Sequence, residues 1–238
     1  MKIVHAIAAV IFVLCLPLLL VSTNLRFIIN SASFYTREFD RYHISQDTGL
    51  PREELGKVAR GMIVYFNNGD EFIHLTVQGP QGPFELFKEK EMEHLKDVKG
   101  LVRLDYKVQG VTLACVLAYL AFVLNWKRRQ AWRYIGRSAM AGSALTMVLL
   151  LALGITSAVD FNAVFLLFHL VSFTNLLWIL DPSTDYMIRI FTWQFFYDAV
   201  LLLAGATLLE ALLIGGISWW RLKGTKKPRH VGAKKRAS

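Results

Sequence analysis

The sequence predicts a mainly α-helical membrane protein with four transmembrane helices, a small extracytoplasmic α+β cap and a helical segment in the outer leaflet. Hydrophobic residues make up 54% of the 238 positions, and the mean hydropathy is +0.39. A helix crosses a ~30 Å hydrocarbon core with about 20 residues at ~1.5 Å each. Four runs with almost no charge have about this length, near residues 3–22, 108–124, 138–159 and 199–218.

The placement of charge is the second observation. The connection 127–137 carries five Lys or Arg and the tail 221–238 carries eight, with no acid in either, whereas 24–103 holds 11 basic and 12 acidic residues. Because short basic segments stay in the cytoplasm, we expect both termini inside the cell and 24–103 outside. The net charge of +9 then reflects topology, so no nucleic-acid partner is expected, and the tail is expected to touch membrane phospholipid.

The first span, 1–23, is interpreted as a retained helix. Its apolar core is longer than that of a signal peptide, and no small-x-small cleavage motif follows it. The two cysteines of the chain, Cys15 and Cys115, both fall inside predicted spans. They therefore indicate no disulfide framework in the exposed region between the spans.

The predicted cap, 24–103, contains helix and strand signals in turn. SASFYTREFDRYHI has aromatic residues at helical spacing, and LPREELGKVARGMIVYFNN begins with a proline and two acids, which is typical of a helix start. EFIHLTVQG alternates and favours a strand, and the turn-rich QGPQGPFELF allows a second short one. A charged helix from Glu89 is expected to continue directly into the second span, 104–126.

The segment 160–195, between the third span 138–159 and the fourth span 196–220, is apolar enough in its first half to resemble a fifth span. A fifth span would place the basic tail outside the cell, against the distribution of positive charge. We therefore expect this segment in the outer leaflet, where irregular backbone is tolerated if protein or water surrounds it. Asp181 is expected to cap a short helix that starts at Pro182.

Two histidines at the predicted outer boundary are the main candidates for chemistry, because the sequence has no G-x-S-x-G, H-E-x-x-H or glycine-rich phosphate loop. Asp97 follows His94 by three residues, so both lie on one helical face and the carboxylate is placed to orient the imidazole. Each histidine has an ordinary alternative, a solvated charged face for His94 and a buried hydrogen bond for His169. Their expected meeting at one level favours a shared site.

Glu210 is an acid inside the fourth span, and acids within a membrane are functional candidates. It lies about fourteen residues, or ~21 Å, below the predicted outer end of that span. That depth is too great for direct chemistry with either histidine. We interpret Glu210 as an interhelical hydrogen bonder.

Two segments resemble the signature blocks of the bacterial lipoprotein intramolecular transacylase family, namely EMEHLKDVKGL and VFLLFHLVSFTNLLWILDPSTDYMIRIFTWQFF. The predicted four-span layout with an outer cap is similar to that family as well, so the resemblance covers most of the chain. The matching positions are Glu91, His94, Asp97 and Val98 in the first block, and Phe168, His169, Phe173, Asn175, Trp178, Asp181, Pro182, Asp185, Phe195 and Phe196 in the second.

The resemblance implies an O-to-N acyltransferase of the bacterial cell membrane, with its active site at the extracytoplasmic face. The substrate would be a diacylated lipoprotein, whose sn-2 acyl chain moves from glycerol to the α-amine of the N-terminal cysteine, giving the lyso form. Amine and ester share one molecule, which can supply ~10⁵–10⁸ M effective concentration, so no cofactor, metal or protein nucleophile is required.

Proton transfer is then the main task for the protein, and imidazoles suit it. The resemblance implies catalytic roles for His94 and His169, without saying which is acid and which is base. It also implies that Asp97, Asn175 and Asp185 orient these groups or stabilise an oxyanion. The remaining motif residues are expected to give structural support; they are Glu91, Trp178, Asp181 and Pro182.

Two other functions remain open at this stage. In a metal-dependent membrane hydrolase, the two histidines, Asp97 and either Asp181 or Asp185 would bind zinc. In a lipid-binding protein without catalysis, replacement of His94 and His169 would leave cellular function intact. Neither alternative needs a different membrane topology.

Overall fold

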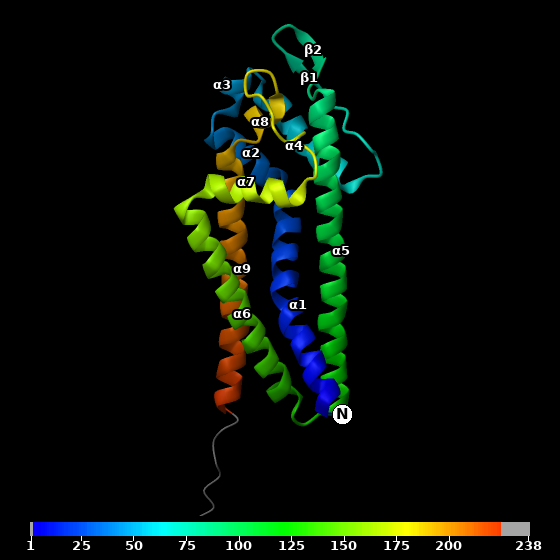
Figure 1. Ribbon diagram of the computed structural model, residues 1–238, viewed down its shortest axis with the longest axis vertical. Coiled ribbons are helices and arrows are strands. Elements are labelled where there is room, and N and C mark those ends of the chain that lie inside the picture. Colours follow the sequence, from blue (N-terminus) through cyan, green and yellow to red (C-terminus); the bar gives the residue numbers. More distant parts are fainter. Residues whose placement is uncertain (1, 225–238) are drawn as a thin grey trace, which may run out of the picture.

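Four long helices form a bundle along the main axis of the molecule (Figure 1). The computed structural model describes residues 2–224. Four helices are long and apolar enough to cross a membrane, which confirms the predicted fold class. They are α1 (Lys2–Ile29), α5 (Glu89–Trp126), α6 (Ala131–Val159) and α9 (Trp193–Gly224). Of the predicted basic tail, 221–238, the first four residues belong to α9, and the residues beyond Gly224 lie outside the described part of the chain.

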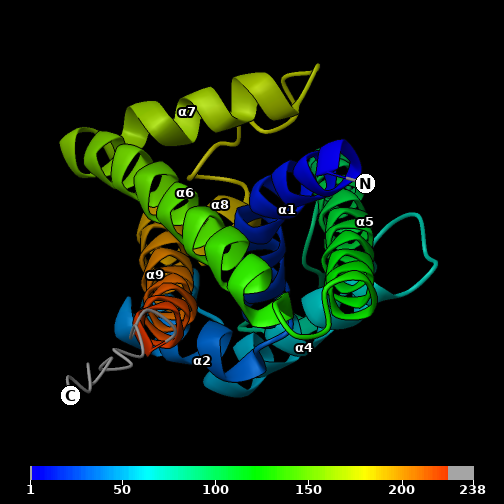
Figure 2. The ribbon, with the colours of Figure 1, turned by 90° about the horizontal axis from the view of Figure 1, so that it is seen from below.

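Helix α1 is the centre of the bundle, because it packs against α5, α6 and α9, while α6 also packs along α9 (Figure 2). A small residue allows the close approach of α1 and α6. A Cβ added to Gly142 would lie 2.8 Å from Cδ2 of Leu16. Small residues at helix crossings are the usual means of close packing in membranes, where lipid competes for every apolar surface.

A polar bridge joins α1 to α9. Nδ2 of Asn24 donates to Oγ1 of Thr207 at 3.1 Å and to Oε2 of Glu210 at 2.8 Å. This confirms the interpretation of Glu210 as an interhelical hydrogen bonder. Asn24 lies five residues before the end of α1, about 8 Å along the helix, so the bridge lies in the half of the bundle that is nearer to the cap.

The cap covers one end of the bundle and is built on the first part of α5. Its helices are α2 (Ala32–Arg41), α3 (Ile44–Thr48) and α4 (Arg52–Asn67), and its strands are β1 (Thr76–Gly79) and β2 (Gly82–Glu85). The helix predicted from Pro51 and the uninterrupted helix from Glu89 into the second span are both confirmed. Helix α5 has 38 residues, about twice what a membrane crossing requires, so it joins cap and bundle rigidly.

The predicted strand EFIHLTVQG is shorter in the structure, where only Thr76–Gly79 pairs. Its antiparallel partner β2 has four residues. It starts at Gly82, where the backbone leaves the turn with φ 115°, and it ends shortly before α5 begins at Glu89. The first residues of the predicted strand are held elsewhere. The carbonyl of Glu71 accepts a 2.9 Å hydrogen bond from the hydroxyl of Tyr65 in α4.

Helix α7 (Phe161–Ser172) lies across the bundle at its junction with the cap (Figures 1 and 2). Its 12 residues extend for about 18 Å, too short to cross a membrane. Asp160 starts it, since its Oδ1 accepts from the N–H of Ala163 at 3.0 Å. We call residues 173–185, which follow α7, the strap; they lead to α8 (Tyr186–Ile190).

The predicted helix start at Asp181 and Pro182 is wrong. The carbonyl of Asp181 accepts from the N–H of Asp185 at 2.8 Å, and Oδ2 of Asp185 accepts from the N–H of Asp181 at 2.8 Å. This reciprocal pair closes residues 181–185 into a turn. Helix α8 therefore begins only at Tyr186, after Asp185.

Candidate active site

The structure brings together the two histidines singled out in the sequence, which lie on different helices and are 75 residues apart in the chain. The ring of His94 on α5 lies 6.2 Å from the ring of His169 on α7, centroid to centroid, with 30° between their planes. Both side chains are buried, with 3% and 8% of their surface exposed. The pair lies where α7 and the strap meet the cap portion of α5.

His169 is held in one tautomer by its own helix. Its Nδ1 lies 2.7 Å from the carbonyl oxygen of Phe165, one turn earlier. Because a carbonyl oxygen only accepts, Nδ1 carries a proton, and in the neutral imidazole the lone pair is then on Nε2. Aromatic rings surround the imidazole, at centroid distances of 4.4 Å for Phe165, 5.0 Å for Trp178 and 5.6 Å for Phe173. They fix the plane of the ring.

His94 is neutral at physiological pH. It lies in the sixth position of α5, before the uncharged run that starts at residue 108, so it is outside the membrane-spanning part of the helix. Burial, together with the neighbouring His169, lowers the pKa of His94 to about 4, although Asp97 acts in the opposite direction. Its Nδ1 is buried without a hydrogen-bond partner among the described residues. An orphaned buried nitrogen beside a second imidazole is suited to a group that a substrate supplies.

Asp97 holds the strap instead of the imidazole of His94, which is a departure from the predicted contact. Its Oδ2 accepts from Nδ2 of Asn175 at 2.8 Å. The carbonyl of Asn175 in turn accepts from Nε1 of Trp178 at 3.0 Å. Asp97 thus acts on His169 indirectly: it holds Asn175, Asn175 holds Trp178, and the ring of Trp178 lies beside His169.

The other end of the strap is bound to the start of α5 by Glu91, which has no exposed surface. Its carboxylate accepts from the N–H of Lys88 at 2.8 Å and from the N–H of Met187 in α8 at 2.7 Å. Burial raises the pKa of Glu91, against the effect of these two hydrogen bonds. Glu91 and Asp97 stand one helical turn before and after His94, and each fastens one end of the segment 173–187.

Asp185 strengthens the attachment near Glu91 and brings in a residue that sequence reasoning missed. Nζ of Lys88 donates to Oδ1 of Asp185 at 3.0 Å. Burial alone would raise the pKa of Asp185, but hydrogen bonds from Asp181 and Lys88 hold it below its usual range. Lys88 sits at the helix cap just before the E-x-x-H-x-x-D motif, and only that position in the sequence pointed to it.

Three other motif residues have rings beside the histidine pair: Phe173 lies 4.9 Å from His94, and Trp178 and Phe168 lie 5.0 and 5.4 Å from His169, centroid to centroid. Oδ1 of Asp181 accepts from the N–H and the hydroxyl of Ser183 at 2.8 and 2.7 Å, which stiffens the turn that includes Pro182. In residues 2–224, no group of three or more His, Cys, Asp or Glu is gathered closely enough to bind a metal ion.

Comparison with known proteins decides the family. Residues 10–196 match the family model described as lipoprotein intramolecular transacylase Lit. The chain belongs to the lipoprotein intramolecular transacylase family. This transacylase is therefore a multi-pass membrane enzyme, an acyltransferase that moves an acyl chain within a lipoprotein molecule.

Solved structures share the fold of this transacylase. The membrane-integral lipoprotein intramolecular transacylase Lit from Bacillus cereus superposes with a TM-score of 0.82 at 19% identity, covering 95% of this chain and 99% of that one. A variant of that protein with one histidine replaced by alanine gives a TM-score of 0.75 at 18% identity, covering 94% and 96%. An uncharacterized protein of Aquifex aeolicus is 27% identical over 188 residues, 77% of this chain and 81% of its own.

Proposed function

We propose that His94 and His169 form the active site of this transacylase and act as one proton-handling unit. The observation that carries the proposal is their pairing in a buried place. His169 has a defined lone pair on Nε2, and His94 has a buried Nδ1 with no partner among the described residues. One imidazole is committed to a tautomer, and the other is free to adopt the tautomer that the substrate requires.

The reaction needs such a pair because its protons balance within one substrate. The α-amine of the N-terminal cysteine attacks the sn-2 ester carbonyl, a C–N bond forms, and the C–O bond to glycerol breaks. The amine loses a proton and the glycerol oxygen gains one. Two neighbouring imidazoles can accept the first proton and return one to the leaving oxygen, with no net change in the enzyme.

The strap residues have supporting roles in this proposal. Asp97 and Asn175 set the position of Trp178 and thus the wall around His169. Glu91 and Asp185 fasten the far end of the strap to α5. Pro182 and Asp181 keep the turn between these attachments rigid. None of these carboxylates is required to accept the amine proton.

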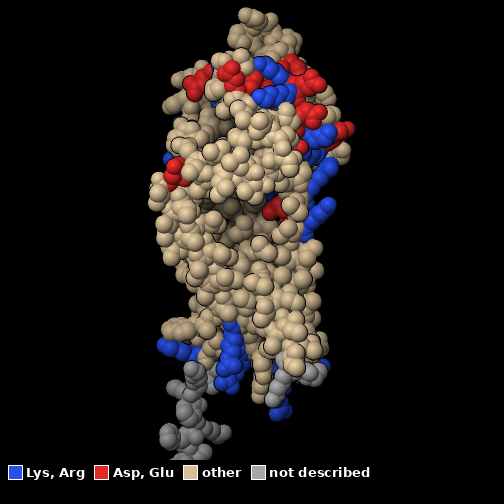
Figure 3. Space-filling model, viewed as in Figure 1, with Lys and Arg blue, Asp and Glu red and all other residues tan. Residues whose placement is uncertain are grey.

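We place the site at the extracytoplasmic face, with both termini in the cytoplasm and spans over 1–23, 104–126, 138–159 and 196–220. The charge distribution supports this orientation, because the end of the bundle away from the cap shows Lys and Arg without acids on the face in Figure 3. Helix α7 would then lie in the outer leaflet. Its exposed apolar side chains support this, among them Leu167 at 60%, Phe168 at 51% and Val171 at 79% exposed.

Mass spectrometry of a synthetic diacylated lipopeptide tests the reaction directly. Intramolecular transfer gives a product of unchanged mass in which fragmentation places one acyl chain on the cysteine nitrogen. A hydrolase would instead release free fatty acid and shorten the lipopeptide by one chain. Purified wild-type protein should give the isomer, and the His94→Ala variant should not. Release of fatty acid without the N-acyl isomer would contradict the proposal.

A further inference from the structure

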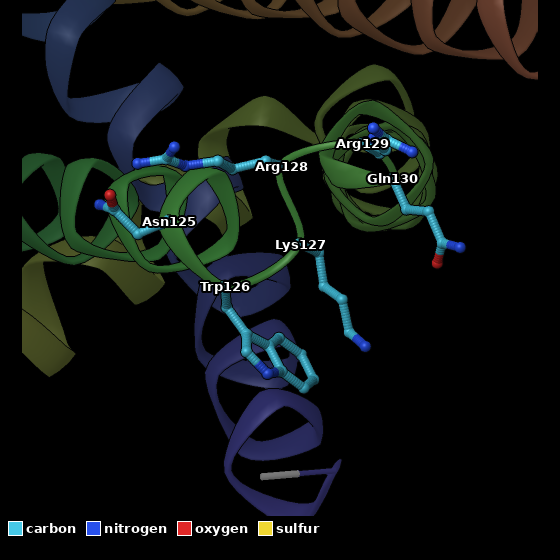
Figure 4. Close-up of a pocket in the computed structure, with 6 residues that line it drawn as sticks. All are labelled: Asn125, Trp126, Lys127, Arg128, Arg129 and Gln130. Carbon is cyan, nitrogen blue, oxygen red and sulfur yellow. The ribbon is translucent and has the colours of Figure 1, made fainter.

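A hollow at the end of the bundle opposite the histidine pair lies in the turn between α5 and α6. It has a volume of ≈ 400 Å³ and is lined by Asn125, Trp126, Lys127, Arg128, Arg129 and Gln130 (Figure 4). Half of the lining residues are cations. Nothing in the transfer reaction uses this place, which is separated from His94 by most of the length of α5.

The charge of this hollow has no internal counterpart. The described stretches of chain that reach this end of the bundle, 2–37, 106–159 and 211–224, contain no Asp or Glu. The neighbouring turns of α6 add Arg133 and Arg137. Cations that the protein itself leaves unneutralised attract an anion from outside.

One wall of the hollow is rigid. The ring of Trp126 lies 5.5 Å from Phe122, 6.1 Å from Tyr134 and 5.3 Å from the ring of His5, centroid to centroid. Nζ of Lys127 lies over the Trp126 ring at 4.6 Å. These contacts place one lysine at the opening in advance, so an anion meets an arrangement that is already formed.

Depth identifies the kind of anion. Tryptophans gather at the boundary between lipid chains and water, and three exposed tryptophans lie at this end, Trp132 at 64%, Trp219 at 52% and Trp220 at 70% exposed. The hollow is therefore at the level of lipid head groups. Guanidinium groups suit phosphate because they present paired N–H donors.

We propose that this hollow binds the phosphate of an anionic phospholipid at Lys127, with Trp126 as the wall beside the head group. Arg128 and Arg129, which point away from Lys127 in Figure 4, add to the positive charge that attracts the lipid. In the orientation proposed above, that lipid belongs to the inner leaflet. Bound lipid would fix the α5–α6 turn and thereby the lower ends of the two helices. The binding test below uses protein in detergent, so its result does not depend on orientation or on the proposed chemistry.

Native mass spectrometry of the full chain in detergent tests the preference. Phosphatidylglycerol should remain bound at least about tenfold more than phosphatidylcholine, as expected for several cations acting on one anionic head group. The double variant Arg128→Gln/Arg129→Gln should lose this preference. The variant Arg60→Gln/Lys107→Gln removes the same charge from exposed positions outside the hollow and should keep it. Equal retention of the two lipids by the wild type would overturn the proposal, and so would an unchanged preference in the first variant.

A second measurement locates the lipid without altering charge, in case the double variant fails to fold. Brominated phosphatidylglycerol should quench the tryptophan fluorescence of the wild type. The variant Trp126→Phe should lose more of that quenching than the control variant Trp193→Phe. Equal quenching in both variants would place the lipid elsewhere. Glycerol phosphate tests whether a soluble phosphate binds at the same place. If it displaced the lipid at an equal concentration, the hollow would be a site for soluble phosphate, which would contradict a lipid site.

Discussion

The side chain of Asn175 donates a 2.8 Å hydrogen bond from Nδ2 to Oδ2 of Asp97, across 78 residues of chain. This bond ties the strap to α5 one turn after His94. The same Asn175 accepts the indole N–H of Trp178 on its backbone carbonyl, and the Trp178 ring lies 5.0 Å from that of His169. Asp97 therefore affects the second histidine through two hydrogen bonds and a ring contact.

Removal of this bond should lower activity less than removal of either histidine. Asparagine at this position still accepts from Asn175 but without the charge, which is worth about 1–1.5 kcal/mol, so Asp97→Asn should lower kcat/KM by about 10-fold. The exchanged pair Asp97→Asn/Asn175→Asp restores a carboxylate to one side of the bond and should recover part of the loss. If the exchange gave no recovery in a lipopeptide assay, the effect of Asp97 would have to act directly on His94.

The two histidines should behave as one unit when they are removed. His94→Ala and His169→Ala should each abolish nearly all turnover, and the double variant should be little worse, because groups that share one proton transfer are not additive. Single-turnover rates of N-acyl product formation measure this. Phe168→Ala is a control, since that ring lines the same region without proton chemistry. Two modest and additive losses would show that the histidines are structural.

Much of the fold could be predicted because the bilayer fixes it. A span needs a minimum length of apolar chain, and the basic residues near 127–137 mark one end of the bundle, so the four helices follow from local composition. Helix α5 was also predictable from the absence of a break between Glu89 and Trp126. These features depend on neighbours in the chain.

Two of the missed features depend on partners far away in the sequence, and one depends on a side-chain bond within a turn. Asp97 was expected to orient His94 because the two share a helical face, but Asn175 takes the carboxylate. Lys88 reaches Asp185 across 97 residues. Helix α8 starts later than predicted because Asp185 bonds back to Asp181. Residue spacing alone does not report these bonds, although the two motif blocks did predict that His94 and His169 lie together.

Membrane orientation gives a prediction that does not involve catalysis. A reporter fused after Ser238 should be active only in the cytoplasm, and one inserted near Asn67, at the end of α4, should be active only when exported. The reason is the excess of Lys and Arg at one end of the bundle, which is retained inside. A reporter after Gly100, within α5, is unsuitable because it would interrupt the helix. An exported C-terminus would mean that α7 and the strap cross the membrane.

The activity should depend on pH mainly through the substrate amine. That amine must be neutral to attack and has a pKa of about 7.7–8.0, whereas His94, with a pKa of about 4, stays neutral well below this range. We expect kcat/KM to fall by about tenfold per pH unit below about pH 7.5, with a single-proton slope. A substrate whose amine has a lower pKa should shift the curve by the same amount. A limb that did not move with the substrate would assign the titration to the enzyme.

The stability of the fold should depend on pH through His94. Its pKa falls from an ordinary 6.5 to about 4 on folding, because burial disfavours the imidazolium. Below about pH 6.5 the unfolded chain binds a proton that the folded chain refuses, so the stability contributed by the neutral histidine is complete above that pH and is lost as pH falls toward 4. At about pH 5 the ratio of folded to unfolded protein should be lower by ~30-fold from this residue.

The variant His94→Gln provides the comparison, because glutamine does not titrate. Thermal unfolding in detergent, followed between about pH 5 and pH 8, should show a steeper loss of Tm for the wild type than for the variant. His43→Gln is the matched control, since that cap residue lies outside the site and should leave the wild-type slope in place. Parallel curves for the wild type and His94→Gln would mean that His94 takes up its proton in the folded state. That result would contradict the neutral, buried imidazole on which the proposed proton exchange depends.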